Sequence, residues 1–271
     1  MTITLDARLT GGGESADAPS TQLDRISLIL ESFDGHAQQS LSDVTRRTGL
    51  PRSTAHRMLE RLVHMQWVRK DGRDYELGAR LIELGSLAAS QSRLHAAALP
   101  VMRELQRVTG HMVYLGVLDG DDVLYTQRIG NPRGRVAPAR VGGRCPARLS
   151  PIGLCLLAFA PQSADPGAGA ALDPQLARVR EDGVAYVDSG DAFGIGAPIG
   201  EAGHAVGALS ICAPGGELRQ DHRLAAPVRM AAASIMHSLT RRDAGVVPVL
   251  PRRQPLRTLP SAGLRHAAHG A

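Results

Sequence analysis

The feature that most constrains the fold is a pair of amphipathic stretches joined by a turn of about four residues. Ser40 can cap a short helix that stops at Thr48-Gly49. Pro51 favours the first turn of a second helix, whose apolar stripe follows the helical period. The spacing therefore predicts two helices that meet across a tight turn.

The segments on either side of this pair extend the arrangement. Residues 21–33 have a helical apolar period, and Ser20 or Thr21 can cap them. Residues 67–78 alternate apolar and polar positions around Asp71-Gly72, which is typical of a β-hairpin. Three helices followed by a hairpin predict a winged helix-turn-helix over residues 20–78.

Positive charge is concentrated on the second helix of the pair. Residues 46–61 contain five Arg and one Glu, whereas residues 20–78 as a whole contain nine basic and eight acidic side chains. Polar side chains off the apolar stripe can meet base edges and phosphates in a major groove, and basic side chains at the hairpin tip can lie beside the DNA backbone. A solvated cationic helix face is the alternative interpretation. The candidate DNA-binding residues are Arg52, Ser53, Thr54, His56, Arg57, Arg69, Lys70 and Arg73.

The rest of the chain predicts a second domain of a different kind. A largely helical segment, interrupted near Pro100, predicts a linker helix over residues 79–94 and the first helix of a domain over residues 95–241. Strands in the middle of this domain and helices at both ends predict an α+β fold, with a mainly antiparallel sheet and helices on one face. The runs typical of strands are residues 111–129, which contain two, and residues 183–188, 192–199 and 204–213.

Composition excludes several classes of protein. No apolar run approaches the roughly 18 residues that a membrane span needs, and residues 1–19 lack the order of a signal peptide. We therefore expect a cytoplasmic protein without a membrane partner. Cys145, Cys155 and Cys212 form no metal-binding motif, so we expect reduced thiols, no metal and no cofactor.

The formal net charge of +5 does not by itself indicate a nucleic-acid partner. Residues 241–271 contain six Arg and one Asp, so they carry the whole excess of positive charge. Residues 1–19 and 242–271 have no apolar period, and we predict that both segments are disordered.

Several separated motifs resemble those of the IclR family of bacterial regulators, in the family's order. They are GLPRSTAHRMLERL and DYELGARLIELG in the first domain, then VGGRCPARLSPIGLCLLAF, LARVREDGVAYV and GHAVGALSICAP in the second. The similarity covers about residues 20–215. It implies a homodimer or a dimer of dimers that recognises a palindromic operator in double-stranded DNA. It also implies a GAF-like effector domain whose pocket takes a small metabolite, often one with a carboxylate.

The resemblance further implies the position of the effector site. Ser210 and Cys212 share one face of a predicted strand, where they could bind a ligand or simply pack. Asp188 could instead accept a hydrogen bond in the turn at Ser189-Gly190. Cys155 lies among leucines and is expected to be a core thiol. The effector-binding candidates that the family motifs imply are Cys145, Pro146, Ser150, Gly153, Asp188, Ser210 and Cys212.

Two departures from the family pattern concern this effector site. Leu154 stands where the family usually has Lys, and residues 187–198 form a segment about four residues shorter than the family's. These departures leave open a DNA-binding protein whose C-terminal domain only dimerises.

An enzyme is the remaining alternative. A GAF-like domain could use Cys145 or Cys212 as a nucleophile, but Arg144 is the one cation adjacent to either of them in sequence. Paired carboxylates, a nucleophile elbow, a phosphate loop and a metal-binding cluster are absent from the sequence. We therefore predict no catalytic residues, and a DNA-binding repressor controlled by a small-molecule metabolite.

Overall fold

The computed structural model describes residues 21–130, 140–161, 174–190, 192–214 and 222–241. The predictions of disorder over residues 1–19 and 242–271 concern residues outside this described part. Contacts divide the chain into two compact units, residues 1–89 and 90–271.

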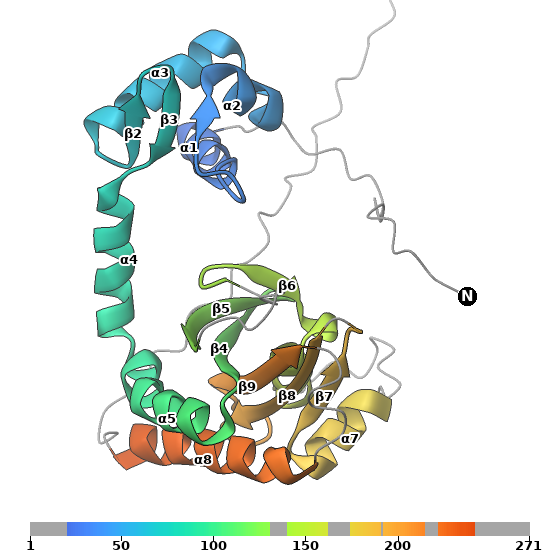
Figure 1. Cartoon of the computed structure of the whole chain (residues 1–271). Coiled ribbons are helices and arrows are strands. Elements are labelled where there is room, and N and C mark those ends of the chain that lie inside the picture. Colours follow the sequence, from blue (N-terminus) through green and yellow to red (C-terminus); the bar gives the residue numbers. More distant parts are fainter. Residues whose placement is uncertain (1–20, 131–139, 162–173, 191, 215–221, 242–271) are drawn as a thin grey trace, which may run out of the picture. The chain divides into compact units, whose positions relative to one another are not determined.

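Between residues 21 and 78, the structure shows three helices and a small antiparallel sheet of order β1-β3-β2 (Figure 1). Strand β1 pairs Gln39 with Tyr75 of β3, and its two residues gave no strand signal in the sequence. The predicted winged helix-turn-helix is confirmed. The elements are α1 (Gln22–Glu31), β1 (Gln39–Ser40), α2 (Leu41–Thr48), α3 (Arg52–His64), β2 (Val68–Asp71) and β3 (Asp74–Leu77).

Local interactions fix where these helices begin and end. Thr21 and Ser40 each form a capping box, in which the hydroxyl accepts from a backbone N–H while the aspartate three residues on accepts from the cap residue. Gly49 ends α2 with φ of +69°, in the left-handed region that glycine adopts without strain. The apolar faces that result form one core. Its buried members are Ile29, Phe33, Val44, Leu50, Ala55, Met58, Leu59, Leu62, Val68 and Tyr75.

Helix α4 (Ala79–Gln91) follows the hairpin and has no buried residue. It nevertheless carries large apolar side chains, and Ile82, Leu84 and Leu87 are all exposed. A helix of this composition is stable in water chiefly when another surface covers its apolar side.

The described residues of the second unit form a six-stranded sheet of order β6-β5-β4-β9-β8-β7, in which every neighbouring pair is antiparallel. The predicted α+β fold with a mainly antiparallel sheet is therefore confirmed. The strands are β4 (Met112–Asp119), β5 (Asp122–Ile129), β6 (Arg144–Pro146), β7 (Ala185–Asp188), β8 (Ala192–Ile199) and β9 (Gly207–Pro214). The helices are α5 (Arg93–Thr109), α6 (Pro151–Ala158), α7 (Pro174–Asp182) and α8 (Ala225–Arg241), with 3₁₀ turns at Ala147–Leu149 and His222–Leu224.

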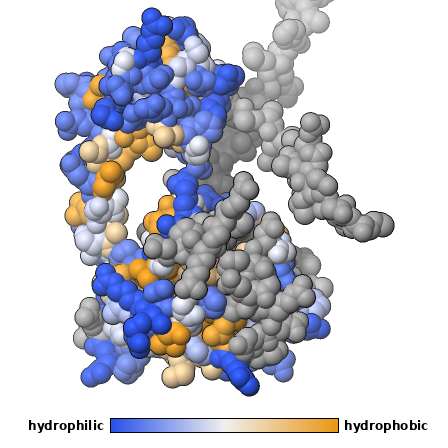
Figure 2. Space-filling model, viewed as in Figure 1, coloured by the Kyte–Doolittle hydropathy of each residue, from blue (hydrophilic) through white to orange (hydrophobic). Residues whose placement is uncertain are grey.

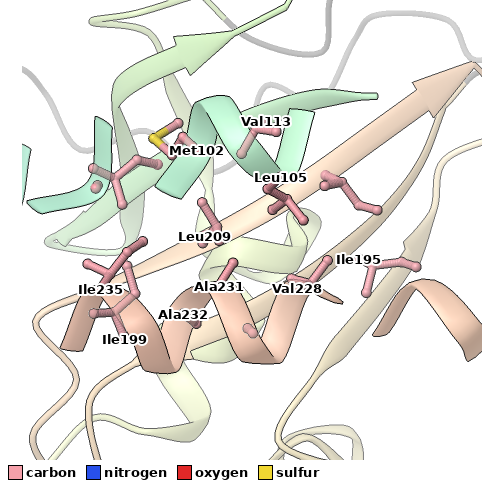
Figure 3. Close-up of a cluster of buried hydrophobic side chains, with 14 of the residues drawn as sticks. Met102, Leu105, Val113, Ile195, Ile199, Leu209, Val228, Ala231, Ala232 and Ile235 are labelled. Atoms are coloured by element: carbon pink, nitrogen blue, oxygen red, sulfur yellow. The ribbon is translucent and has the colours of Figure 1, made fainter. Parts of the chain in front are cut away.

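Helices cover both faces of this sheet, so the prediction of helices on one face is wrong. Figure 3 shows one side, where α5 and α8 pack on the sheet through residues such as Met102, Leu209 and Ile235. On the other side α6 and α7 cover a second core, which contains Ile152 and Val179. The sequence signal was weak because α6 is apolar all round and therefore has no amphipathic period.

The predicted interruption near Pro100 is also wrong. Helix α5 begins after Ser92, whose hydroxyl accepts from the N–H of His95, and continues through Pro100 to Thr109. Proline removes the hydrogen bond to the carbonyl four residues earlier. Because both Pro100 and Ala96 are exposed, water can satisfy that carbonyl.

Small residues let α6 approach the sheet closely. A Cβ on Gly194 would lie 2.8 Å from the Cγ of Pro151, and one on Gly196 would lie 2.8 Å from the backbone of Pro151. The N-terminus of α6 therefore rests directly on the backbone of β8.

Candidate nucleic-acid interface and effector site

The turn between α2 and α3 sets the direction of the second helix. Gly49 turns the chain, Leu50 is buried in the core, and Pro51 has the extended backbone of an N-cap residue. Burial of Leu50 and of the apolar stripe of α3 leaves the opposite side of this helix in solvent.

The exposed side of α3 carries most of the predicted reading residues. Arg52, Ser53, His56 and Arg57 are exposed, whereas Thr54 is half-buried. Arg52 donates from Nη1 to the hydroxyl of Ser42 on α2, at 3.2 Å. This bond links the two helices of the motif.

Two exposed arginines of α3 have no carboxylate partner among the described residues. Within the described part of the chain, the side chains of Arg57 and Arg61 form no hydrogen bond or ion pair, and both residues are exposed. Arg61 was not among the sequence candidates. The sequence spacing could have identified Arg61, because it follows Arg57 by four residues and so lies on the same side of the helix.

The hairpin presents its three basic residues in different states. Arg73 is exposed next to Gly72, which turns the hairpin with φ of +58°. Arg69 is 2.6 Å from the carboxylate of Glu76. Lys70 pairs with Glu60 of α3, and the same cation lies 5.5 Å from the ring centre of Tyr75.

A second group of polar side chains lies inside the C-terminal unit, between the sheet and α6. Ser210 of β9 is buried, and its hydroxyl is 3.9 Å from the Sγ of Cys212. Ser150 caps α6, accepting from the N–H of Gly153 at 2.9 Å, and lies near the hydroxyl of Tyr125. Four of the predicted effector residues thus gather near two tyrosines: Cys145, Ser150 and Cys212 lie near Tyr125, and Ser210 lies opposite Tyr114 in the sheet.

Two tyrosines of this group were missed by the sequence analysis. Tyr114 and Tyr125 are buried and meet edge to face, with ring centres 5.5 Å apart. Tyr125 also lies near Cys145, and burial raises the pKa of its hydroxyl well above the ordinary value. Alternation along β5 places Tyr125 on the same side as Val123, which was the available signal.

The thiols of this group are protonated at neutral pH. Burial raises the pKa of Cys212 to about 12, and burial with the nearby carboxylate of Asp122 raises the pKa of Cys145. A thiol in this state donates a weak hydrogen bond and is a poor nucleophile.

The remaining effector candidates lie apart from the tyrosines or serve the packing. The carboxylate of Asp188 accepts from the N–H of Gly190 at 2.9 Å in an exposed turn, and its pairing with Phe193 places it on the α8 side of the sheet. A Cβ on Gly153 would lie 2.0 Å from the carbonyl oxygen of Ala147, so close packing requires this glycine. Pro146 is exposed at the end of β6.

Two neighbouring residues named in the sequence analysis, Leu154 and Cys155, lie in the core. Cys155 is fully buried in the core, and burial raises the pKa of its thiol to about 12, as expected of a core thiol. Leu154 is also fully buried. Across the described residues, no group of His, Cys, Asp and Glu side chains is arranged to hold a metal ion, and no helix is long and apolar enough to cross a membrane.

The sequence matches two family models. The model for the IclR helix-turn-helix domain matches residues 22–72, and the model for the C-terminal domain of bacterial IclR transcriptional regulators matches residues 86–165. Fold and site together define a two-domain protein, with a winged helix-turn-helix joined to an α+β domain that buries a polar cluster. The chain belongs to the IclR family.

The curated relatives that match this chain are named as transcriptional regulators, not as enzymes. The regulator XynR of Escherichia coli K12 is 29% identical over 140 residues, which is 51% of this chain and 56% of XynR. KdgR of the same organism is 30% identical over 133 residues, which is 48% of this chain and 51% of KdgR. The chain thus spans about half the length of the curated relatives that it matches.

A solved structure of similar fold covers more of the chain. It is an IclR homolog from Microbacterium hydrocarbonoxydans in complex with 4-hydroxybenzoate. The TM-score is 0.69 at 30% identity, and the match covers 82% of this chain and 100% of that one.

Proposed function

We propose that this chain is a DNA-binding transcriptional repressor whose C-terminal domain binds a small-molecule metabolite. The observation that carries the proposal is the exposed side of α3, where Arg57 and Arg61 have no partner among the described residues. A helix with such a side, set by a tight turn and followed by a basic hairpin, fits the major groove of double-stranded DNA. A cytoplasmic location follows from that role.

We propose the domain boundaries that the sequence predicts. Residues 20–78 bind DNA, residues 79–94 form the linker helix, and residues 95–241 bind the effector. Arg52, Ser53, Thr54, His56 and Arg57 read the groove, and the hairpin residues Arg69, Lys70 and Arg73 contact phosphates.

The effector is proposed to be a small aromatic acid or phenol. Tyr114 and Tyr125 offer aromatic edges, and Ser150 and Ser210 offer hydroxyls within the same buried group. The relative from Microbacterium hydrocarbonoxydans was crystallised with 4-hydroxybenzoate, which has this chemistry. Cys145 and Cys212, with protonated thiols, complete the set of side chains proposed to contact the effector.

A homodimer, or a dimer of dimers, is proposed to bind a palindromic operator. The support is α4, whose large apolar side chains are exposed along its length (Figure 2). Leu81, Leu84 and Ala88 recur at intervals of three and four residues, the spacing by which one helix packs on a second copy of itself. Two winged domains would then meet two half-sites related by symmetry.

The proposed DNA interface is tested by replacing Arg57, one of its cations without a partner among the described residues. Arg57→Ala is expected to weaken binding to a duplex selected from a random library, because it removes a phosphate or base contact, by about 1–3 kcal/mol if it reads a base. Arg107→Ala on α5 is the matched control, since Arg107 is exposed and paired with Glu104. Unchanged affinity of the Arg57 variant at an unchanged melting temperature would contradict the assignment of α3.

A further inference from the structure

One carboxylate oxygen joins the proposed reading helix to the hairpin. The Oε1 of Glu60 on α3 accepts from the Nζ of Lys70 on β2 at 3.2 Å, and the same oxygen is 3.7 Å from the Nε2 of His56. All three side chains are about half exposed. Glu60 therefore contacts a proposed base-reading residue and a proposed phosphate-binding residue together.

The pleat of the hairpin makes this contact specific to Lys70. Lys70 pairs across the ladder with Tyr75, whose ring is buried in the core, so both side chains lie on the α3 side of the sheet. Arg69 pairs with Glu76 on the other side, where Gln38 also donates to that carboxylate. The hydrogen bond that Lys70 donates to Glu60 raises the pKa of Lys70, so the pair stays ionised.

The pair is easily exchanged for a phosphate. Exposed ion pairs contribute little to stability because water screens both charges. DNA phosphates attract Lys strongly through counterion release. Lys70 thus stays paired with Glu60 until a phosphate lies close enough to replace the carboxylate. The side chains of Arg57, Arg61 and Arg73 have no such partner among the described residues.

We propose that Glu60 is a specificity-determining residue of the DNA interface, which pairs with Lys70 and opposes binding to DNA of the wrong sequence. This inference rests on the proposed DNA-binding function. Binding to non-operator DNA depends almost entirely on phosphate contacts. It is therefore weakened most when Lys70 stays paired with Glu60 and when the carboxylate of Glu60 repels the phosphates. At an operator, base contacts fix α3 in the groove and bring a phosphate to Lys70, which offsets the loss of the pair.

The test compares Glu60→Gln with wild type by fluorescence anisotropy, on a short duplex of mixed sequence and on a duplex selected from a random library by the wild-type protein. Glu60→Gln is expected to tighten binding to the mixed duplex by about two- to fivefold, the range that an exposed pair supplies. Binding to the selected duplex should change less. On the mixed duplex, the slope of log affinity against log salt should steepen by about one phosphate contact.

Two variants separate this role from general charge. Glu31→Gln removes an equal charge from α1, where the carboxylate accepts from Ser27 and has no cation partner among the described residues, and should leave the ratio of the two affinities unchanged. In a Lys70→Ala background, Glu60→Gln should no longer tighten binding to the mixed duplex. A similar gain from Glu31→Gln, or an undiminished gain without Lys70, would overturn the inference. Wild-type protein that binds neither duplex would overturn the proposed function along with it.

Discussion

At the scale of single residues, the three cysteines share one physical state for different reasons. Cys155 is enclosed by apolar side chains, Cys212 lies beside Ser210, and Cys145 contacts Tyr125. In each case burial disfavours the thiolate, so each pKa is raised above the ordinary value for cysteine. A catalytic cysteine needs the opposite shift.

This state predicts slow alkylation of the folded protein. At pH 7 to 8 iodoacetamide should modify Cys145 and Cys212 about tenfold or more slowly than a cysteine in the unfolded chain, because only the thiolate reacts. Since raised pKa values shift the thiolate to higher pH, the rates should still be rising at pH 9. The measurement is mass spectrometry of peptides over time, with protein in denaturant as the control. A rate that reaches its plateau below pH 8 would indicate a lowered pKa and favour an enzyme.

Burial or exposure of a residue could be predicted from the sequence better than the contacts that the residue makes. The exposed side of α3 followed from its apolar stripe, because the period alone assigns each position to the core or to solvent. The pairing of Lys70 with Glu60 did not, because it depends on how the hairpin lies against α3. Gly153 shows the same limit: the family motif implied a ligand contact, whereas the structure places it against Ala147.

At the scale of elements, amphipathic helices and hairpins were predictable and short or fully buried elements were not. Each of these signals is local: Ser40 and Asp43 cap α2 from positions three residues apart, and Gly72 lies between the two strands of the hairpin. Strand β6 has three residues and exists because β5 lies beside it. Helix α6 is apolar on all sides, so its sequence carries no period.

Helix α4 gives the prediction at this scale. Leu84→Glu should convert a dimer to a monomer at micromolar concentration, because it puts a charge into the proposed apolar seam with Leu81 and Ala88. Ser86→Glu adds the same charge on the opposite side of the helix and should leave the dimer intact. Light scattering coupled to size-exclusion chromatography measures both. Equal masses for the two variants and wild type would mean that α4 does not hold the dimer.

At the scale of the whole molecule, the order of strands in the larger sheet could not be deduced from the sequence. Strands β4 and β9 are neighbours although about 90 residues separate them, and this pairing sets Ser210 opposite Tyr114. The candidate effector cluster is therefore a product of long-range topology. Local patterns placed Ser210 and Cys212 on one face, but only the pairing of β9 with β4 and β8 brings the tyrosines and Pro151 to them.

Two binding functions in one chain predict a reciprocal effect. If an effector weakens operator affinity by some factor, the operator must weaken effector affinity by the same factor. We expect 4-hydroxybenzoate, used as a probe of small aromatic acids, to raise the melting temperature of the wild-type protein. At about 100 times its dissociation constant it should add about 2.7 kcal/mol to the free energy of unfolding.

Ser210→Ala tests where that effector binds. The variant should lose much of the shift in melting temperature and much of the effect of 4-hydroxybenzoate on operator affinity, since it lacks a hydroxyl in the buried cluster. Its affinity for the selected duplex without effector should match that of wild type. Asp188→Asn is the control, because an amide oxygen can still accept from Gly190 and the side chain lies on the other side of the sheet. If Ser210→Ala binds the probe as wild type does and still releases DNA, the effector site lies elsewhere in the molecule.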